Sequence, residues 1–314
     1  MKTRWIPVFV LMFITPILTE LLSTNMSASA FFHPYNLVML MTLGYGFPIL
    51  IIREIMVRKK LGLTSLFLLG IIYGLYNEGI IAKTLFLGGI SPIPNLAEYG
   101  LILGVRVPWA IIITVWHALH AVIYPIVFTY IFFPDVKESW IGKKTAWTLG
   151  LIIFLFGTIN FFSFDGEIPA GSLAHYIFLL SSIAVLFIAS IFWPKKPELI
   201  AVNAGRSLKL ISLGVVGYML TFFIPLAIAD IPINPFLLSA YLIITLAIAL
   251  ILLTFKETIS IGSAVQFGIG NEIAFLLFVL LTSFGNPETL LTTLVLLIGF
   301  IIFLHLTHKK RSKY

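Results

Sequence analysis

Long runs of apolar residues follow one another along the whole chain, and short segments that carry most of the charged residues separate them. A helix needs ~20 mostly apolar residues to cross a hydrocarbon layer of ~30 Å. The runs reach or approach this length, and a large soluble core does not explain their regular recurrence. The pattern therefore predicts ten transmembrane helices, over residues 6–24, 36–52, 62–82, 108–133, 147–163, 173–193, 209–229, 236–255, 264–284 and 290–307.

The positions of lysine and arginine test this count independently. Connections between successive spans alternate between the two sides of the membrane, and of the 20 Lys and Arg residues only Lys83 and Arg106 fall in odd-numbered connections. Basic residues concentrate in cytoplasmic loops. We therefore predict an all-α transmembrane helix bundle of about ten spans, a single integral membrane domain over residues 1–314, with both termini in the cytoplasm.

Composition agrees with this class and narrows the chemistry. Hydrophobic residues make up 60% of the chain and charged residues 11%, whereas a soluble domain carries about 25% charged residues. The net charge of +7 would suggest nucleic acid in a soluble protein. Here the basic residues lie in short loops, so we expect the lipid bilayer of the cell membrane as the partner of this multi-pass protein, and no nucleic acid. The absence of cysteine excludes disulfides and thiolate ligands.

Three ionisable residues inside predicted spans are the candidate catalytic residues. Glu78 lies in the outer half of the third span, in the stretch Tyr73–Gly79, and shares a helix face with Gly70 and Gly74. Glycines at this spacing allow a neighbouring helix to approach closely. His117 and His120 share a face of the fourth span, at roughly 13–18 Å from its outer end at 1.5 Å per residue. The acid and the imidazoles are therefore predicted at similar depths.

These residue types suggest two kinds of site and one structural alternative. Glu78, His117 and His120 could together bind Zn²⁺, with water completing the coordination. Glu78 could instead be a general base, with a histidine stabilising an oxyanion. The alternative is a hydrogen-bond network that ties the third and fourth spans together. Other polar residues predicted in the outer-to-middle layer are Glu20, Asn160 and His175.

The motif Gly-x-x-Asn-Glu occurs twice, at Gly74–Glu78 and at Gly268–Glu272. Glu272 is predicted in the inner half of the ninth span, away from Glu78, and we interpret the repetition as coincidence. Glu272 itself could relay protons, or it could be a buried acid bonded to a neighbour. Prolines within predicted spans, which kink helices and free backbone carbonyls, are Pro16, Pro48, Pro125 and Pro225.

Two further features lie near the membrane surfaces. A cytoplasmic cluster, made of Arg53, Glu54, Arg58, Lys59 and Lys60, could bind anionic lipid headgroups or could only fix the orientation of the chain. On the other side, Asn25-Met26-Ser27 matches the acceptor pattern for N-glycosylation, which also arises by chance. The long external connection Gly88–Val107 could cover a site or be a plain link.

The segments Arg53–Leu61, Tyr73–Lys83 and His117–Pro125 resemble a group of uncharacterised prokaryotic multi-spanning membrane proteins. More distantly, Asn77-Glu78 and Trp116-x-x-x-His120 resemble two motifs of the CPBP (Abi, CAAX-protease-like) intramembrane peptidases. That resemblance implies a glutamate that activates water and histidines that bind it or stabilise the oxyanion. Asn77 replaces the first of the family's two glutamates, Lys83 lies one residue beyond the arginine position, and no third histidine motif follows.

Three functions therefore remain open from the sequence. The leading hypothesis is a CPBP-like intramembrane hydrolase that uses Glu78, His117 and His120, with zinc as the candidate cofactor. The first alternative is a transporter or proton-coupled carrier, whose pathway Glu20, Glu78 and Glu272 would line. The second is a non-catalytic membrane scaffold whose buried polar groups hold the helices together.

Overall fold

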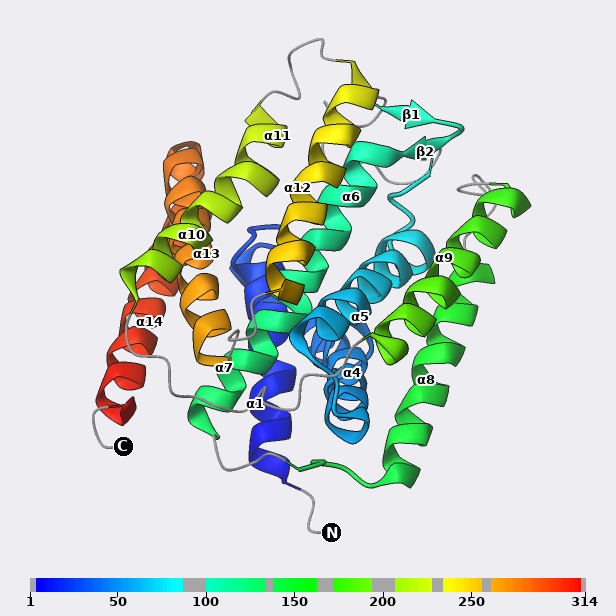
Figure 1. The fold of residues 1–314 in the computed structure, drawn as a ribbon. Coiled ribbons are helices and arrows are strands. Elements are labelled where there is room, and N and C mark those ends of the chain that lie inside the picture. Colours follow the sequence, from blue (N-terminus) through cyan, green and yellow to red (C-terminus); the bar gives the residue numbers. More distant parts are fainter. Residues whose placement is uncertain are drawn as a thin grey trace.

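The computed structural model describes residues 4–86, 100–133, 138–162, 172–193, 207–227, 234–255 and 261–311, and nearly all of them are helical (Figure 1). This confirms the all-α prediction. Within these residues six helices are long and apolar enough to cross a membrane: Pro34–Lys59, Leu63–Ile81, Val107–Phe132, Lys143–Phe162, Leu173–Phe192 and Gly262–Gly285. Shorter apolar helices are Trp5–Leu21, Leu208–Phe223, Pro235–Ile248 and Pro287–Phe303. Each predicted span coincides with one of these helices, whereas the number that cross the membrane stays a prediction.

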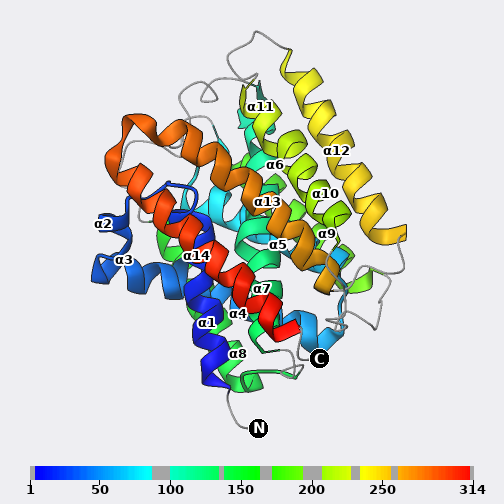
Figure 2. The same cartoon turned by 90° about the vertical axis from the view of Figure 1, so that its left-hand side faces the viewer.

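Regular α-helical segments make up most of the described chain. They are α1 (Trp5–Pro16), α2 (Ala28–Phe31), α3 (Pro34–Met39), α4 (Gly46–Lys59), α5 (Leu63–Tyr76), α6 (Val107–Trp116), α7 (Tyr124–Phe132), α8 (Lys143–Phe162), α9 (Leu173–Phe192), α10 (Leu208–Tyr218), α11 (Ile224–Ala227), α12 (Pro235–Phe255), α13 (Ile261–Thr282) and α14 (Pro287–Arg311). A 3₁₀ turn, η7 (Ser283–Gly285), joins the antiparallel pair α13 and α14 (Figure 2). The beginning of α1 and the end of α14 lie at the same end of the bundle (Figure 1).

Wider π-helical turns interrupt several of these helices. They are η1 (Ile17–Leu21), η2 (Leu40–Gly44), η3 (Asn77–Ile81), η5 (His117–Ile123) and η6 (Met219–Phe223). Such turns are rare and are found frequently at functional sites. Glu20, Glu78 and both candidate histidines lie within three of them, whereas Glu272 lies within the regular helix α13.

The in-span prolines lie close to four of the π-helical turns. Pro16 directly precedes η1, Pro48 follows η2, Pro125 follows η5 and Pro225 follows η6. Proline has no N–H and leaves the carbonyl four residues earlier without its helical partner. For Pro48 that carbonyl belongs to Gly44, and the Tyr73 hydroxyl donates a hydrogen bond to it at 2.5 Å. A neighbouring helix thus satisfies the freed carbonyl, as the sequence predicts.

One helix, composed of α6, η5 and α7, lies at the centre of the bundle. In its most apolar stretch 78% of the residues are buried, against 6% in α8 and 11% in α9. The outer helices α8 and α9 therefore expose most of their side chains at the edge of the molecule (Figure 1). A two-stranded hairpin, β1 (Leu101–Ile102) and β2 (Val105–Arg106), leads directly into α6. Of the predicted long connection Gly88–Val107, residues 88–99 lie outside the described residues.

Helix α5 packs so closely against the central helix that the two backbones are in direct contact. A Cβ atom added at Gly70 would lie 2.5 Å from the Cα of Ala118, and one at Gly74 would lie 2.8 Å from the Cα of Thr114. Real Cβ atoms do not approach other atoms so closely, so only glycine fits at these two positions. The predicted glycine face of the third span is therefore the face that meets the fourth.

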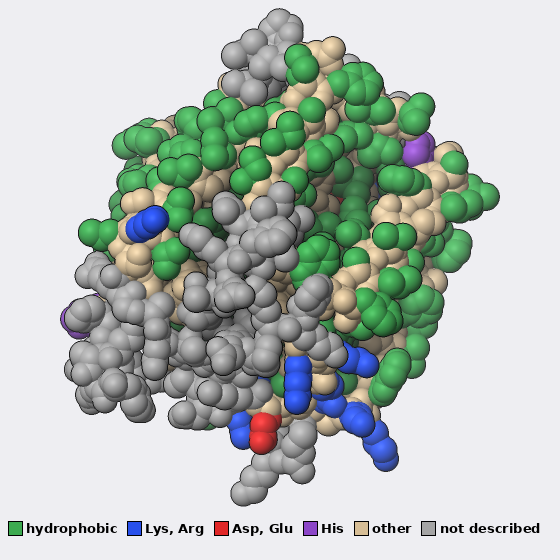
Figure 3. All heavy atoms as spheres, viewed as in Figure 1, with side chains coloured by type: hydrophobic (Ala, Val, Ile, Leu, Met, Phe, Trp, Pro, Cys, Tyr) green, Lys and Arg blue, Asp and Glu red, His purple; other side chains and the backbone are tan. Residues whose placement is uncertain are grey.

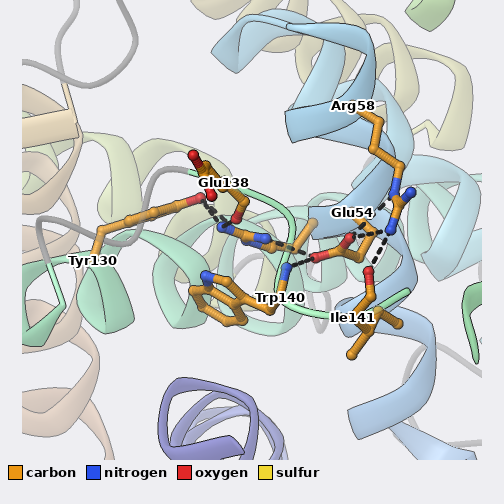
Figure 4. Close-up of polar contacts among 7 residues, drawn as sticks. Glu54, Arg58, Tyr130, Glu138, Trp140 and Ile141 are labelled. Atoms are coloured by element: carbon orange, nitrogen blue, oxygen red, sulfur yellow. Dashed lines mark hydrogen bonds and ion pairs between the residues drawn. The ribbon is translucent and has the colours of Figure 1, made fainter. Parts of the chain in front are cut away.

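In the C-terminal half of α4, a buried ion network attaches this helix to the residues that precede α8 (Figure 4). Arg53, with none of its side chain exposed, donates to Glu54 at 2.7 Å, to the Tyr130 hydroxyl and to the Glu138 carbonyl, and its guanidinium lies 3.7 Å above the Trp140 ring. The backbone N–H of Trp140 donates to Glu54 at 2.8 Å, and Arg58 holds the other oxygen of Glu54 at 2.9 Å.

This network corrects one part of the sequence interpretation. The charge pattern places Arg53 and Glu54 in a cytoplasmic loop cluster, but both lie within α4 and are buried. Their charges compensate each other and their remaining polar atoms are hydrogen-bonded, as burial requires. Of the same cluster, Lys59 and Lys60 are exposed.

We predict that Gly70→Ala lowers the free energy of unfolding by about 1–3 kcal/mol, because the added methyl overpacks the contact with Ala118. Thermal unfolding in detergent measures this change. Gly299→Ala is the matched control, since Gly299 is also helical but has nothing within 4 Å of an added Cβ. Equal unfolding temperatures for both variants would contradict the close approach of α5.

We also predict that Glu54→Gln destabilises the protein by about 3–5 kcal/mol, because it leaves the buried Arg53 charge without its partner. The control is Lys59→Gln, which removes an exposed charge on the same helix and should change stability by less than about 0.5 kcal/mol. Unfolding midpoints of the two variants that coincide would show that the network is not needed for stability.

Candidate functional site

Glu78 and His117 form a direct contact between α5 and the central helix. Glu78 Oε1 lies 2.8 Å from His117 Nε2, and both side chains are buried. The amide nitrogen of Asn77 lies 3.2 Å from the same imidazole nitrogen. Because one ring nitrogen serves both contacts, the tautomer of His117 and the orientation of the Asn77 amide depend on each other. His117 Nδ1 is buried without a partner among the described residues.

The second oxygen of Glu78 is fixed by the segment that follows η3. The Thr84 hydroxyl donates to Glu78 Oε2, and the Trp109 indole N–H donates to Thr84 Oγ1 at 3.0 Å. Arg106 donates to the carbonyl of Thr84 at 2.9 Å and to that of Phe86 at 2.7 Å. Burial lowers the pKa of both Arg106 and Lys83 below their ordinary values. His117 and the Thr84 hydroxyl therefore hold the two oxygens of Glu78 in place.

Glu20 lies on the other side of His117, one aromatic ring away. The Tyr45 hydroxyl donates to Glu20 Oε1, and Asn25 donates to Glu20 Oε2 at 2.6 Å. The Tyr45 ring is stacked against the His117 ring, with 6.2 Å between the centroids, and the Tyr73 ring meets it edge-on at 5.4 Å. Thus Glu20 joins the layer that the sequence predicts for it.

His120 contacts a different carboxylate, Glu272 of α13. His120 Nδ1 lies 2.9 Å from Glu272 Oε1. This is ion-pair distance, but the two atoms are not aligned for a hydrogen bond, and both Glu272 oxygens are without one among the described residues. The hydroxyl of Tyr124, four residues after His120, is also buried without a hydrogen-bond partner among the described residues. These are the least satisfied polar groups of the described interior.

Aromatic rings enclose His120 on several sides. The Trp116 indole stacks on the imidazole, with 3.6 Å between centroids and 15° between planes. The rings of Tyr124, Phe222 and Phe275 meet His120 at steeper angles, with centroid distances of 5.1, 6.0 and 5.7 Å. The faces of aromatic rings attract cations. Together with Glu272, these rings surround the His120 imidazole with groups that attract positive charge.

The repeated Gly-x-x-Asn-Glu motif has the same role at both of its positions. In each copy the glycine and the glutamate lie four residues apart and face the central helix. A Cβ at Gly74 would meet Thr114 and His117, and one at Gly268 would meet the Tyr124 ring at 2.9 Å. Glu78 then reaches His117 and Glu272 reaches His120. The structure thus gives the repetition a physical basis that the interpretation as coincidence did not.

The three candidate site residues therefore do not form one group, because only two of them are in contact. His117 lies with Glu78, whereas His120 lies with Glu272 on the side of α13. In the part of the chain that the structure describes, no group of three or more His, Asp or Glu residues could hold a metal ion. The site expected for Zn²⁺, with Glu78, His117 and His120 as its ligands, does not form in this arrangement.

The other polar residues of the predicted layer lie elsewhere. Asn160 donates to the Phe156 carbonyl of its own helix at 3.0 Å. His175 caps the start of α9 and contacts the carbonyl of Leu103 at the hairpin tip. Neither of them contacts Glu78 or the two histidines in the interactions observed. For Asn25, the side-chain nitrogen that glycosylation would modify is the atom that donates to Glu20.

Sequence reasoning missed the pairing of His120 with Glu272 and the aromatic enclosure around them. Two signals in the sequence could have indicated the pairing. The glutamate motif is repeated, and the two histidines lie a turn apart, so that one is nearer the outer end of the span and the other deeper. Nothing in the sequence indicates that Phe222 packs against His120.

A protein-family model described as an uncharacterized membrane protein family matches residues 9–313. Neither the curated proteins nor the solved structures contain a match to the chain. The CPBP resemblance therefore gains no support, whereas the resemblance to an uncharacterised membrane protein group is confirmed over nearly the whole chain. The chain belongs to this uncharacterized membrane protein family.

Proposed function

We propose that the protein is a proton-coupled membrane carrier. One observation carries the proposal: two histidines on successive turns of the central helix each contact a carboxylate from a different neighbouring helix. Ionisable groups inside membrane spans are costly and commonly form ion pathways and proton relays. Imidazole and carboxylate together can hold or release a proton at ordinary pH.

The contacts are arranged so that a proton changes how the helices are held together. Glu78 lies in η3, which continues α5, and Glu272 lies in α13; each contacts one imidazole of the central helix. Protonation of a glutamate removes the charge attraction that helps to hold its helix to the histidine. A change of protonation can therefore loosen or tighten a contact between helices, which is the coupling that a carrier needs.

The π-helical turns supply elements that could move. A π turn has one more residue per hydrogen-bonded ring than an α turn, and its loss or migration rotates the flanking helical segments. Both histidines lie in η5, and Glu78 lies in η3. Three of the four residues that would bind protons therefore lie in π-helical turns, which can rearrange, whereas Glu272 lies in the regular helix α13.

For the carrier, we predict that Glu78→Gln and Glu272→Gln each abolish solute-driven proton movement. The purified protein is placed in vesicles that contain a pH-sensitive dye, and classes of solute are offered in turn: organic cations, amino acids, sugars and organic anions. In the wild type, at least one class moves protons across the membrane. Both variants fall to the rate of protein-free vesicles.

The matched control is Glu288→Gln, which removes an exposed glutamate that bonds to Ser29 outside the polar layer. This variant keeps the wild-type rate. If no solute class moves protons with the wild type, and pH-difference infrared spectra show no titrating carboxyl band that Glu272→Gln removes, the carrier proposal fails and the scaffold alternative is favoured.

A second candidate function is intramembrane hydrolysis, which the 2.8 Å contact between Glu78 and His117 favours. A carboxylate–imidazole pair can take a proton from water and return it to a leaving group. Here Glu78 would be the base and His117 the group that stabilises the oxyanion, whereas His120 would have no direct part.

For the hydrolase, we predict that Glu78→Gln abolishes cleavage of fluorogenic esters or peptides in detergent micelles, whereas His120→Ala keeps most of the activity. Metal analysis of the same preparations tests the zinc hypothesis. Zinc that is lost in His117→Ala and kept in His120→Ala supports a site built on the Glu78 pair. Zinc lost in both would restore the three-ligand site, and equal zinc in all preparations would remove it.

A further inference from the structure

A large apolar groove lies between the outer helices α8 and α9 and the inner helices α4 and α5. Its volume is about 570 Å³, and nearly all of its surface is apolar. Ile51 and Ile55 of α4 form one wall, and Phe154 of α8 and Leu180 of α9 form the other. The hydroxyl of Tyr76, which also lines the groove, is already bonded to the Ile153 carbonyl at 3.0 Å. The groove therefore offers dispersion contacts and almost no hydrogen bonds.

The dimensions of the groove match a lipid tail. It is lined along α8 from Gly150 to Phe162, a stretch of ~18 Å at 1.5 Å per residue. One leaflet of a hydrocarbon core is ~15 Å thick. The groove also opens on the outer surface of a bundle in which α8 and α9 expose most of their side chains. Any occupant that enters from the side comes from the bilayer.

Exposed positive charge lies one to two helical turns beyond one end of the groove, whose lining ends at Ile55 on α4 and begins at Gly150 on α8. Lys59 and Lys60 end α4, and Lys143 and Lys144 begin α8, and all four side chains are exposed. Figure 3 shows Lys and Arg side chains gathered below the hydrophobic face at the end where α4 ends and α8 begins. Arg58 is held by Glu54, and the exposed acid Glu138 lies 3.7 Å from Arg4. The four lysines are therefore available for an anionic group.

We propose that this groove binds one anionic phospholipid, with an acyl chain between α4 and α8 and the phosphate among Lys59, Lys60, Lys143 and Lys144. Each lysine near a membrane surface contributes measurably to the attraction of an anionic headgroup. The apolar walls alone would accept any tail, and the lysines select the headgroup. This proposal does not depend on carrier or hydrolase activity.

One residue that lines the groove also contacts the polar layer. Tyr73 lines the groove, and its ring is also edge-on to His117 at 5.4 Å. Its hydroxyl donates a hydrogen bond to the carbonyl of Gly44 in η2, which Pro48 leaves without a helical partner. A tail that packs on Tyr73 therefore stabilises the side chain that supports both the His117 ring and a π-helical turn.

The test is native mass spectrometry of the purified full-length protein with two lipids that share the same acyl chains. Palmitoyl-oleoyl-phosphatidylglycerol is the anionic probe, and palmitoyl-oleoyl-phosphatidylcholine is the zwitterionic one. The wild type retains one phosphatidylglycerol in preference to phosphatidylcholine. Lys143→Gln and Lys144→Gln each lower the affinity for phosphatidylglycerol about fivefold, as expected for one lysine at the headgroup. Lys209→Gln on α10, which does not line the groove, leaves the affinity unchanged.

A pair of tryptophan substitutions tests the apolar part. Thr158→Trp places a large ring in the groove and abolishes retention of the lipid, whereas Ile159→Trp, on the exposed side of the same helix, does not. If Thr158→Trp fails to fold, Leu180→Trp fills the groove from α9. The proposal is overturned if the two lipids bind equally, or if the filled groove retains phosphatidylglycerol as the wild type does. It is also overturned if filling converts a dimer into a monomer, because the occupant is then a second copy of the chain.

Discussion

The close contact between α5 and the central helix is the constraint on which the polar interior depends. Without side chains at Gly70 and Gly74, the α5 backbone reaches Ala118 and Thr114 at distances that no other residue allows. Glu78 follows on the same face and arrives at His117 at 2.8 Å. A bulkier residue at either glycine would move the carboxylate away and leave a buried charge without its partner. Backbone packing thus makes the electrostatic contact possible, and the contact in turn compensates a charge that hydrocarbon does not tolerate.

The buried charges of this protein are compensated in two different ways. Arg53 stays charged at any ordinary pH. Its guanidinium donates to the Tyr130 hydroxyl and the Glu138 carbonyl and lies over the Trp140 ring. That network is suited to holding α4 and the residues before α8 together. The pairs at His117 and His120 contain groups that can exchange protons, and Glu272 has no hydrogen bond among the described residues. The permanent charge of Arg53 therefore lies in a fully bonded network, whereas the two imidazoles each contact one carboxylate from a neighbouring helix.

Much of this arrangement follows from the sequence, and the rest depends on packing in three dimensions. Apolar run lengths predict the helices, and the glycine spacing predicts which face of α5 meets its neighbour. Helical periodicity also places Glu78 and His117 at comparable depth. It cannot show that the two histidines, although they share a face in an α-helix, lie in a π turn and point to different helices. Likewise Arg53 looks like a loop residue by charge alone, because its partners Tyr130 and Trp140 come from far along the chain.

The repeated Gly-x-x-Asn-Glu motif connects these observations. Glycine four residues before a glutamate gives a helix one smooth face with an acid at its end, and the central helix receives such a face from α5 and another from α13. The two acids meet imidazoles one turn apart, but their surroundings differ. Glu78 is fixed by Thr84, whereas Glu272 and His120 lie in an aromatic enclosure with unpaired atoms. The same motif therefore gives one acid whose two oxygens both have hydrogen-bond partners and one acid whose oxygens have none among the described residues.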